Sequence, residues 1–430
     1  MTLISLKKCY QNFLAFDVLK VQTIMFWSFW GSIVLFPLGY ITREITPTIC
    51  LFILLRYYKL NWKKTVLRNF NKKILFVFLL FGICVGVFFS TDPINSFFYV
   101  FKHINKGFVY PLVAMECVNS TERLEKITLA FVAVCFWQGC DGIYQSLHGY
   151  DFIDNMPIIK HAYLKHGRLT GSMNDYRVGN FMALTIIPAS ACYIVSRKRM
   201  GLFFSVLVQF ITLFPGLYLL YFSYTRNAYF TLLAASILLA IVHCKFSLLR
   251  QLVFYFLIII VFFIILLVIM PERIGFEAIL HDGRWDLWWF AWHVFLQFPW
   301  VGAGFWQYNH AFRSLGFVPT LDPITISHPH NIYLQLLCES GVLGALSIGT
   351  FLAGFCLWGY RQVRSGLLRS IPKSRAQQHW ILASFFWVAW TSYLLSGIAG
   401  HDFFRDWWFS QAMILFGILV GACSCPVTGQ

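Results

Sequence analysis

Charge is the scarcest property of this 430-residue chain. Only 12% of its residues are charged, whereas 58% are hydrophobic and 19% are aromatic. So few charged side chains cannot cover the apolar surface of the chain in water, and long apolar runs of this kind are typical of membrane-spanning helices. The composition therefore predicts an all-α polytopic membrane protein.

The patterns that bind metals and nucleotides are also missing. The sequence has no CxxC or HExxH spacing, no Walker loop, no GxGxxG after a strand and no Asp-x-Asp pair. His328 and His330 form a His-Pro-His pair, but two histidines without carboxylate partners are weak evidence for a metal site. We therefore expect no metal, no cofactor and no soluble nucleotide as a donor.

The apolar runs predict about twelve membrane-spanning helices. Their expected ranges are 21–41, 44–58, 73–90, 95–117, 127–147, 178–196, 200–222, 226–244, 252–270, 332–360, 380–397 and 407–423. They divide the chain into four parts. The first spans lie in 1–147, a first loop with further spans in 148–270, a large loop with an interfacial helix in 271–331, and the last spans in 332–430.

The placement of the basic residues predicts topology rather than nucleic-acid binding. If the N-terminus is cytoplasmic, 22 of the 34 basic residues fall in cytoplasmic segments and 10 on the opposite side. The positive-inside rule then predicts that both termini are cytoplasmic, with the first apolar run retained as a span. The loops 149–177, 271–331 and 398–406 lie on the outer face, and the first two contain no cysteine for an internal disulfide.

Within the large loop, the run GRWDLWWFAWHVFLQFPWVGAG predicts an amphipathic helix. Its tryptophans and Phe295 recur at helical spacing and form an aromatic face, and Asp286 and His293 lie on a more polar one. Indole side chains are favoured at the boundary between lipid and water. We therefore expect this helix to lie in the membrane interface.

Two arginines stand where helices are expected to begin. Arg226, in SYTRNAY, opens a span, and Arg284 opens the aromatic helix. A cation opposes the macrodipole at a helix N-terminus, so neither arginine is there for helix stability. A guanidinium beside free backbone N–H groups does bind phosphate oxygens well. Snorkelling to lipid phosphates would explain either arginine alone, but the pair predicts an anion site at the outer surface.

A histidine ends the large loop. His330 and Asn331 precede a span that contains Gly341 and Gly344, in the run HNIYLQLLCESGVLG. An imidazole has an unperturbed pKa of about 6.5 and can accept a proton at neutral pH. This position therefore predicts a general base at the membrane surface, and the two glycines are expected to allow close helix packing.

Together these segments resemble the bacterial O-antigen ligase family, which shares its conserved half with O-antigen polymerases and protein O-oligosaccharyltransferases. The similarity extends over roughly 168–407, is weaker in GRLTGSMNDYRVGN than elsewhere, and includes the last outer loop, GIAGHDFFRDWW. The residues that carry it are Arg168, Thr225, Arg226, Arg284, Pro299, Gly302, Gly304, His330, Asn331, Gly341, Gly344 and Asp402.

The resemblance implies a C-type glycosyltransferase architecture in the bacterial inner membrane, with the site at the periplasmic face beneath the large loop. It implies an O-antigen ligase that moves a glycan from undecaprenyl pyrophosphate to a sugar hydroxyl of lipid A-core. An O-antigen polymerase or a protein O-oligosaccharyltransferase fits the same residues. A transporter of polyprenyl-linked glycans is a third interpretation, but it would line several spans with charge, whereas the arginines and the histidine here gather at one face.

Such a transfer requires the charge of the leaving pyrophosphate to be stabilised and the acceptor hydroxyl to be deprotonated. We assign the first task to Arg226 and Arg284 and the second to His330. The residues expected to bind substrate are Arg168, His328, Asn331 and Asp402. No serine, cysteine or carboxylate forms a recognisable nucleophile motif, so we expect a single inverting displacement without metal.

Overall fold

The computed structural model describes residues 3–159, 167–173, 175, 177–243, 283–317 and 328–425. The expected span 252–270 lies outside these residues, as do parts of the loops 149–177 and 271–331. The described residues form helices and no strand beyond two isolated bridges, Tyr150 with Pro157 and Ile159 with Arg168.

The helices follow one another along the chain and vary widely in length. They are α1 (Leu3–Leu35), η1 (Phe36–Leu38), α2 (Tyr40–Asn61), η2 (Trp62–Lys64), α3 (Val66–Asn69), α4 (Ile74–Phe88), α5 (Pro93–Cys117), α6 (Thr121–His148), η3 (Gly171–Met173), α7 (Val178–Ala189), α8 (Cys192–Phe222), α9 (Arg226–His243), α13 (Arg284–Gln297), α14 (Tyr308–Ser314), α15 (Ile332–Arg369), α16 (Arg375–Ser396), η4 (Gly397–Ala399) and α17 (Asp406–Ser424).

Eight stretches of the described residues are helical, long and apolar enough to cross a membrane. They are Asp17–Leu38, Thr121–His148, Val178–Arg197, Met200–Phe222, Arg226–His243, Ile332–Arg369, Arg375–Ala399 and Asp406–Ser424. The prediction of an all-α polytopic membrane protein is confirmed. The number twelve is not, because α2 and α5 are not among the eight and α4 has only 15 residues, about 22 Å of helix against a bilayer core of about 30 Å.

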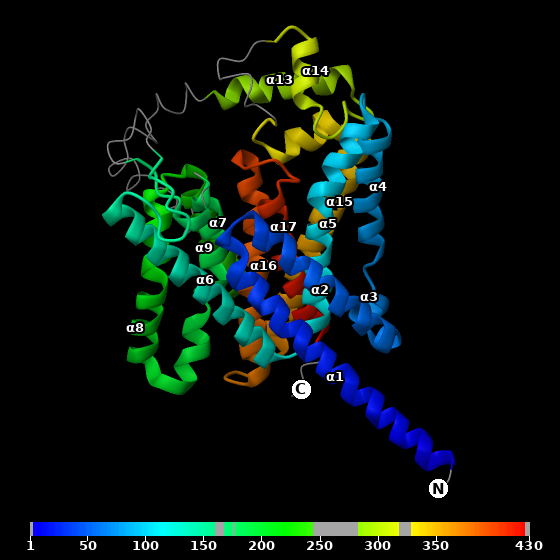
Figure 1. Cartoon of the computed structure of the whole chain (residues 1–430), viewed down its shortest axis with the longest axis vertical. Coiled ribbons are helices and arrows are strands. Elements are labelled where there is room, and N and C mark those ends of the chain that lie inside the picture. The colour runs from blue at the N-terminus through cyan, green and yellow to red at the C-terminus, as the bar shows by residue number, and fades with distance from the viewer. Residues whose placement is uncertain are drawn as a thin grey trace.

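The spans differ in how far other helices enclose them. In Asp406–Ser424, 89% of the most apolar stretch is buried inside the protein. In Met200–Phe222, the buried share is only 28%. The first is therefore an inner helix, which packs against α5 and α16, and the second exposes apolar side chains as a lipid-facing helix does. In Figure 1, α13 lies across one end of the molecule, and α1 begins and α17 ends toward the other.

The aromatic helix forms where the sequence predicts it, as α13. It buries Leu287, Phe290, Ala291 and Val294 against α14 and α15, in a cluster that also holds Tyr308 and Cys338. The buried stripe lies opposite the most exposed tryptophans of this helix, which are Trp285, Trp289 and Trp292. The tryptophans thus face away from the protein core, and the location of α13 in the membrane interface stays a prediction.

The span that follows His330 is not one continuous helix. Inside α15, Gly341 has φ +62° and ψ −172°, which interrupts the helix at that residue. A β-carbon there would lie 2.3 Å from the carbonyl carbon of Trp300, so the turn 299–304 packs directly against the break. Close helix packing, expected for both glycines, holds for Gly344, whose carbonyl oxygen would lie 2.9 Å from a β-carbon on Gly82 of α4. It does not describe Gly341.

Backbone groups on both sides of the break form hydrogen bonds with the turn 299–304. Val342 N donates to Pro299 O at 2.8 Å and Leu343 N donates to Trp300 O at 3.1 Å. In return, the carbonyls of Cys338 and Glu339 accept from Ala303 N and Gly304 N, each at 2.9 Å. An unsatisfied backbone group costs several kcal/mol in lipid. These four bonds therefore satisfy the backbone groups that a break in this candidate membrane span would otherwise leave without partners.

Gly341→Ala should destabilise the protein by about 2–4 kcal/mol, because alanine is strained at this positive φ and its β-carbon would overlap the turn. Gly349→Ala is the matched control, since a β-carbon at Gly349 of the same helix would meet no atom within 4 Å. Thermal unfolding of the two variants in detergent checks this. Equal melting temperatures would mean that the break is not needed.

Candidate functional site

Four arginines and two histidines line one cavity of about 270 Å³ beneath α13. Its walls come from the segment before α7, the starts of α7, α9 and α13, the end of the large loop, and the segment between α16 and α17. The lining residues are Arg168, Arg177, Asn180, Tyr224, Thr225, Arg226, Asn227, Gly283, Arg284, Leu287, His330, Ala399, Gly400 and His401. None of these described lining residues is a carboxylate, so the side chains that they contribute to the wall carry only positive charge.

The structure brings together four of the predicted site residues and leaves three outside. Arg168, Arg226, Arg284 and His330 all line the cavity, although they are far apart in the sequence. The other three, His328, Asn331 and Asp402, are buried close by but are not part of its wall. The tasks assigned to all seven remain proposals.

Both arginines begin helices, as the sequence predicts. Arg226 is the first residue of α9 and Arg284 the first of α13. Gly283, at the N-cap of α13, supplies no side-chain hydrogen bond to the first turn. Asn227 fixes the start of α9, because its Nδ2 donates to the backbone and side-chain oxygens of Ser396 at 2.9 and 3.0 Å. Two helix N-termini therefore open into the cavity beside two guanidinium groups.

The backbone carbonyl of Gly400 selects one tautomer of His330, which lines the cavity. Its backbone is left-handed, with φ +56°, and its Nδ1 lies 3.4 Å from the carbonyl oxygen of Gly400. A carbonyl only accepts, so Nδ1 carries the proton and Nε2 keeps a lone pair. Burial lowers the pKa of His330 well below its usual value, and the nearby His328, Arg177 and Arg284 lower it further. The imidazole is therefore neutral at pH 7 and able to accept a proton.

Asn331 is the N-cap of α15. Its Oδ1 accepts from the backbone N–H groups of Tyr333 and Leu334 at 3.0 and 3.2 Å. Such a cap contributes about 1 kcal/mol to helix stability. It also determines that α15 begins directly after His330, so this asparagine orients the histidine through the backbone.

Asp402 belongs to a buried polar network beside the cavity. It accepts from Nε2 of Gln335 at 2.8 Å, from the backbone N–H of Phe404 at 3.0 Å and from the hydroxyl of Tyr99. The same Gln335 amide donates to Glu339 at 2.9 Å. These bonds tie the segment between α16 and α17 to α5 and α15, and that segment supplies the Gly400 carbonyl.

The cavity contains two residues that the sequence argument missed, Arg177 and His401. Arg177 Nη1 lies 3.1 Å from His401 Nδ1, and Asn180 Nδ2 lies 3.1 Å from His401 Nε2. Arginine only donates, so Nδ1 accepts and the proton of the ring is on Nε2. That proton needs an oxygen, and the buried Asn180 Oδ1 makes no hydrogen bond within the described part of the chain. Rotating the Asn180 amide by half a turn satisfies both groups.

His401 is consequently a neutral acceptor that orients Arg177. Burial lowers its pKa well below the usual range, and the charges of Arg177 and Arg405 lower it further, with smaller contributions from His330 and His328. Arg177 stands at the N-cap of α7, much as Arg226 and Arg284 begin their helices. The argument applied to those two would therefore have selected it too.

The described residues contain no group of three or more His, Cys, Asp or Glu side chains placed to hold a metal ion. Independence of metal remains a prediction.

Comparison with known proteins identifies one family. Residues 210–349 match the family described as O-antigen ligase. The matched segment contains Arg226, Arg284 and His330, and excludes Arg168, Arg177 and His401. No curated protein matches the chain. This segment of the chain is thus similar to the O-antigen ligase family, the family that the sequence motifs indicate.

Proposed function

We propose that this protein is an O-antigen ligase that transfers a glycan from undecaprenyl pyrophosphate to a sugar hydroxyl of lipid A-core, at the periplasmic face of the inner membrane. The observation that carries the proposal is the meeting of Arg168, Arg226, Arg284 and His330 in one cavity. These residues come from four separate segments and combine cations with a neutral base.

The arginines suit the leaving group. As the bond between the anomeric carbon and the pyrophosphate oxygen breaks, negative charge grows on the pyrophosphate. A planar guanidinium binds two phosphate oxygens at once, and two helix N-termini add backbone donors. The donor set is fixed before the reaction, which is what makes such electrostatic stabilisation effective. Arg177, oriented by His401, joins Arg168, Arg226 and Arg284 in this role.

His330 suits the acceptor. The acceptor oxygen attacks the anomeric carbon while its proton moves to Nε2 of His330, and the pyrophosphate leaves with the bonding electrons on the opposite side. One displacement inverts the anomeric centre and requires no covalent intermediate on the protein. The hydrogen bond from Nδ1 to Gly400 selects the tautomer that this step requires.

An O-antigen polymerase or a protein O-oligosaccharyltransferase would use the same donor site with another acceptor. Deletion of the gene followed by electrophoresis of lipopolysaccharide separates the possibilities. Loss of all long glycan, with lipid-linked polymer accumulating, supports the ligase, and caps of a single repeat support the polymerase. A normal ladder would exclude both.

Replacing Arg284 by Ala should reduce transfer on the order of 10²-fold to 10³-fold, because one preorganised donor to the leaving group is lost. Lys should restore little, since it lacks the bidentate fork. Arg226 should behave alike. Arg313→Ala is the control, because this exposed arginine of α14 does not line the cavity. Turnover of lipid-linked donor by purified protein measures the effect, and full activity of the Lys variants would disprove the clamp.

His330→Asn should lower turnover on the order of 10²-fold to 10⁴-fold while the donor still binds, because the arginines remain. Asparagine tolerates the left-handed backbone of this position, so loss of the base is separated from backbone strain. His328→Asn, which removes a buried histidine from outside the wall, should be much milder. If His330→Asn turned over normally, or failed only through lost donor affinity, the histidine would not be the base.

The pH dependence of kcat/KM should show that the pKa of His330 is lowered. A base must be neutral to act, so activity falls only when pH drops through this pKa, and the acid limb should lie below the usual value of about 6.5. Arg177→Gln removes a neighbouring positive charge. It should raise the pKa of His330 and shift the acid limb to higher pH. If the acid limb of kcat/KM did not shift in Arg177→Gln, His330 would not be the group that titrates there.

A further inference from the structure

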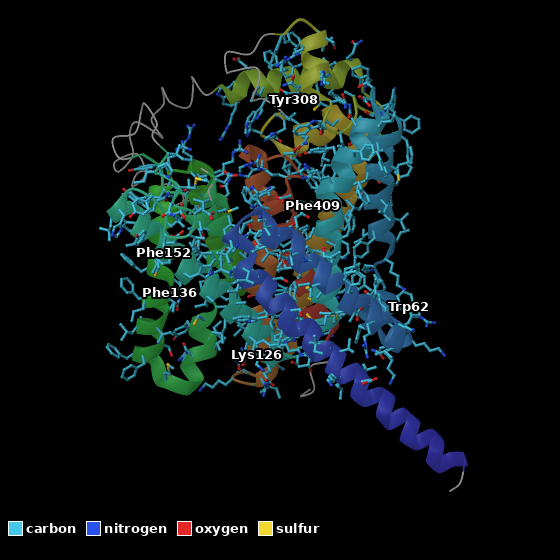
Figure 2. All side chains as sticks on the ribbon, in the orientation of Figure 1. Trp62, Lys126, Phe136, Phe152, Tyr308 and Phe409 are labelled. Atoms are coloured by element: carbon cyan, nitrogen blue, oxygen red, sulfur yellow. The ribbon has the colours of Figure 1, made fainter. Side chains whose placement is uncertain are left out.

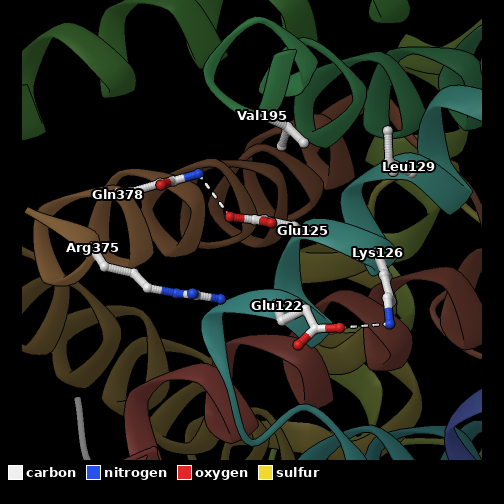
Figure 3. Close-up of a pocket in the computed structure, with 7 residues that line it drawn as sticks. All are labelled: Glu122, Glu125, Lys126, Leu129, Val195, Arg375 and Gln378. Carbon is white, nitrogen blue, oxygen red and sulfur yellow. Dashed lines mark hydrogen bonds and ion pairs between the residues drawn. The ribbon is translucent and has the colours of Figure 1, made fainter. Parts of the chain in front are cut away.

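A second cavity, of about 440 Å³, lies at the end of the molecule opposite α13. Figure 2 shows Lys126, which lines it, in the lower part of the view and Tyr308 near the top. The cavity is formed by the N-terminal parts of α6 and α16 together with α8 (Figure 3). Its lining residues are Glu122, Glu125, Lys126, Leu129, Val195, Arg375 and Gln378.

The wall of this cavity carries two acidic and two basic side chains, so its net charge is zero. Lys126 Nζ lies 2.7 Å from Glu122 Oε1, and Gln378 Nε2 donates to Glu125 Oε1 at 2.7 Å. Arg375 makes no hydrogen bond or ion pair with the residues that the structure describes. Its guanidinium points into the space between the two glutamates in Figure 3. The cavity thus leaves the Arg375 guanidinium and the second oxygen of each glutamate able to contact a ligand.

The balance of charge determines which ligand fits. A simple anion would meet both glutamates, and a simple cation would meet both Arg375 and Lys126. A zwitterion satisfies both kinds of group, with its anionic part on the bases and its cationic part on the acids. Soluble zwitterions and lipid headgroups share this chemistry. The surface beside the cavity indicates which of the two binds.

An apolar stripe continues from the cavity along α6. Leu129 is 39% exposed and Phe136, seven residues further, is 41% exposed on the same face of the helix. Apolar side chains exposed in a membrane-spanning helix contact acyl chains. A ligand whose charged head occupies the cavity and whose tails follow this stripe is a phospholipid.

We propose that this cavity binds the headgroup of a zwitterionic phospholipid with a primary amine, of the phosphatidylethanolamine type. Arg375 and Lys126 bind its phosphate, and Glu125 and Glu122 accept hydrogen bonds from its ammonium group. A primary ammonium has three N–H donors, and the trimethylated group of phosphatidylcholine has none. The site therefore distinguishes these two lipids through hydrogen bonding to the glutamates.

The experiment measures which lipids stay bound. Purified full-length protein is mixed in detergent with equal amounts of phosphatidylethanolamine, phosphatidylcholine and phosphatidylglycerol, and the retained lipids are counted by native mass spectrometry. Phosphatidylethanolamine should be retained on the order of threefold to tenfold more than either other lipid, as expected for charge-assisted hydrogen bonds that are partly exposed. Arg375→Gln and Glu125→Gln should each abolish the preference.

Arg369→Gln is the matched control, because it removes the same charge from an exposed position of α15 outside the cavity. It should keep the preference. Equal retention of the three lipids, a preference for phosphatidylglycerol, or an unchanged preference in both Arg375→Gln and Glu125→Gln would overturn the proposal. Displacement of the lipid by soluble phosphoethanolamine at equal concentration would also overturn it, because a headgroup alone would then be the ligand. Glycan transfer by the same proteins is an independent readout, so the outcome does not depend on the proposed ligase activity.

Discussion

The need to satisfy the backbone N–H and C=O groups of a broken apolar helix determines how this site is built. The break at Gly341 leaves four such groups without helical partners, and the turn 299–304 supplies all four. The same turn follows α13 directly and so anchors the helix that carries Arg284. At the other end of this first part of α15, Asn331 caps the helix and places His330. The first part of α15 thus holds the large loop at two points: the turn that follows Arg284 binds at its break, and His330 directly precedes its first residue.

The described side chains that line the cavity carry positive charge, and the acidic side chains nearby lie outside its wall. Acidic side chains of the neighbouring segments are engaged away from its wall, Asp175 with Arg405 at 3.2 Å and Asp402 with Gln335 at 2.8 Å. The histidines are kept neutral by burial and by the surrounding cations, so they add hydrogen-bonding groups without adding charge. A polyanionic leaving group then finds cations and a neutral base in the same space, which is the combination that the proposed transfer requires.

Much of the helical fold follows from the sequence, since apolar runs report burial in lipid or protein directly. The starts of α9 and α13 at Arg226 and Arg284 were also predictable, because the apolar or aromatic run of each helix begins directly after its arginine. The break at Gly341 was not, because the hydropathy of α15 continues across it and its hydrogen-bond partners lie about forty residues away. His401 was missed because its partners are on α7 and just before it. Asp402 was selected through the family resemblance alone, and only the fold shows that its oxygens accept hydrogen bonds from Tyr99 and Gln335.

The central claim is that the cavity beneath α13 binds the pyrophosphate of a lipid-linked donor. Electron cryo-microscopy of the protein with undecaprenyl pyrophosphate tests it most directly. The account predicts density for both phosphates inside this cavity, with oxygens within hydrogen-bonding distance of Arg226 and Arg284 and the lipid chain leaving between the spans. A diphosphate bound elsewhere, or one that contacts neither arginine, would contradict it.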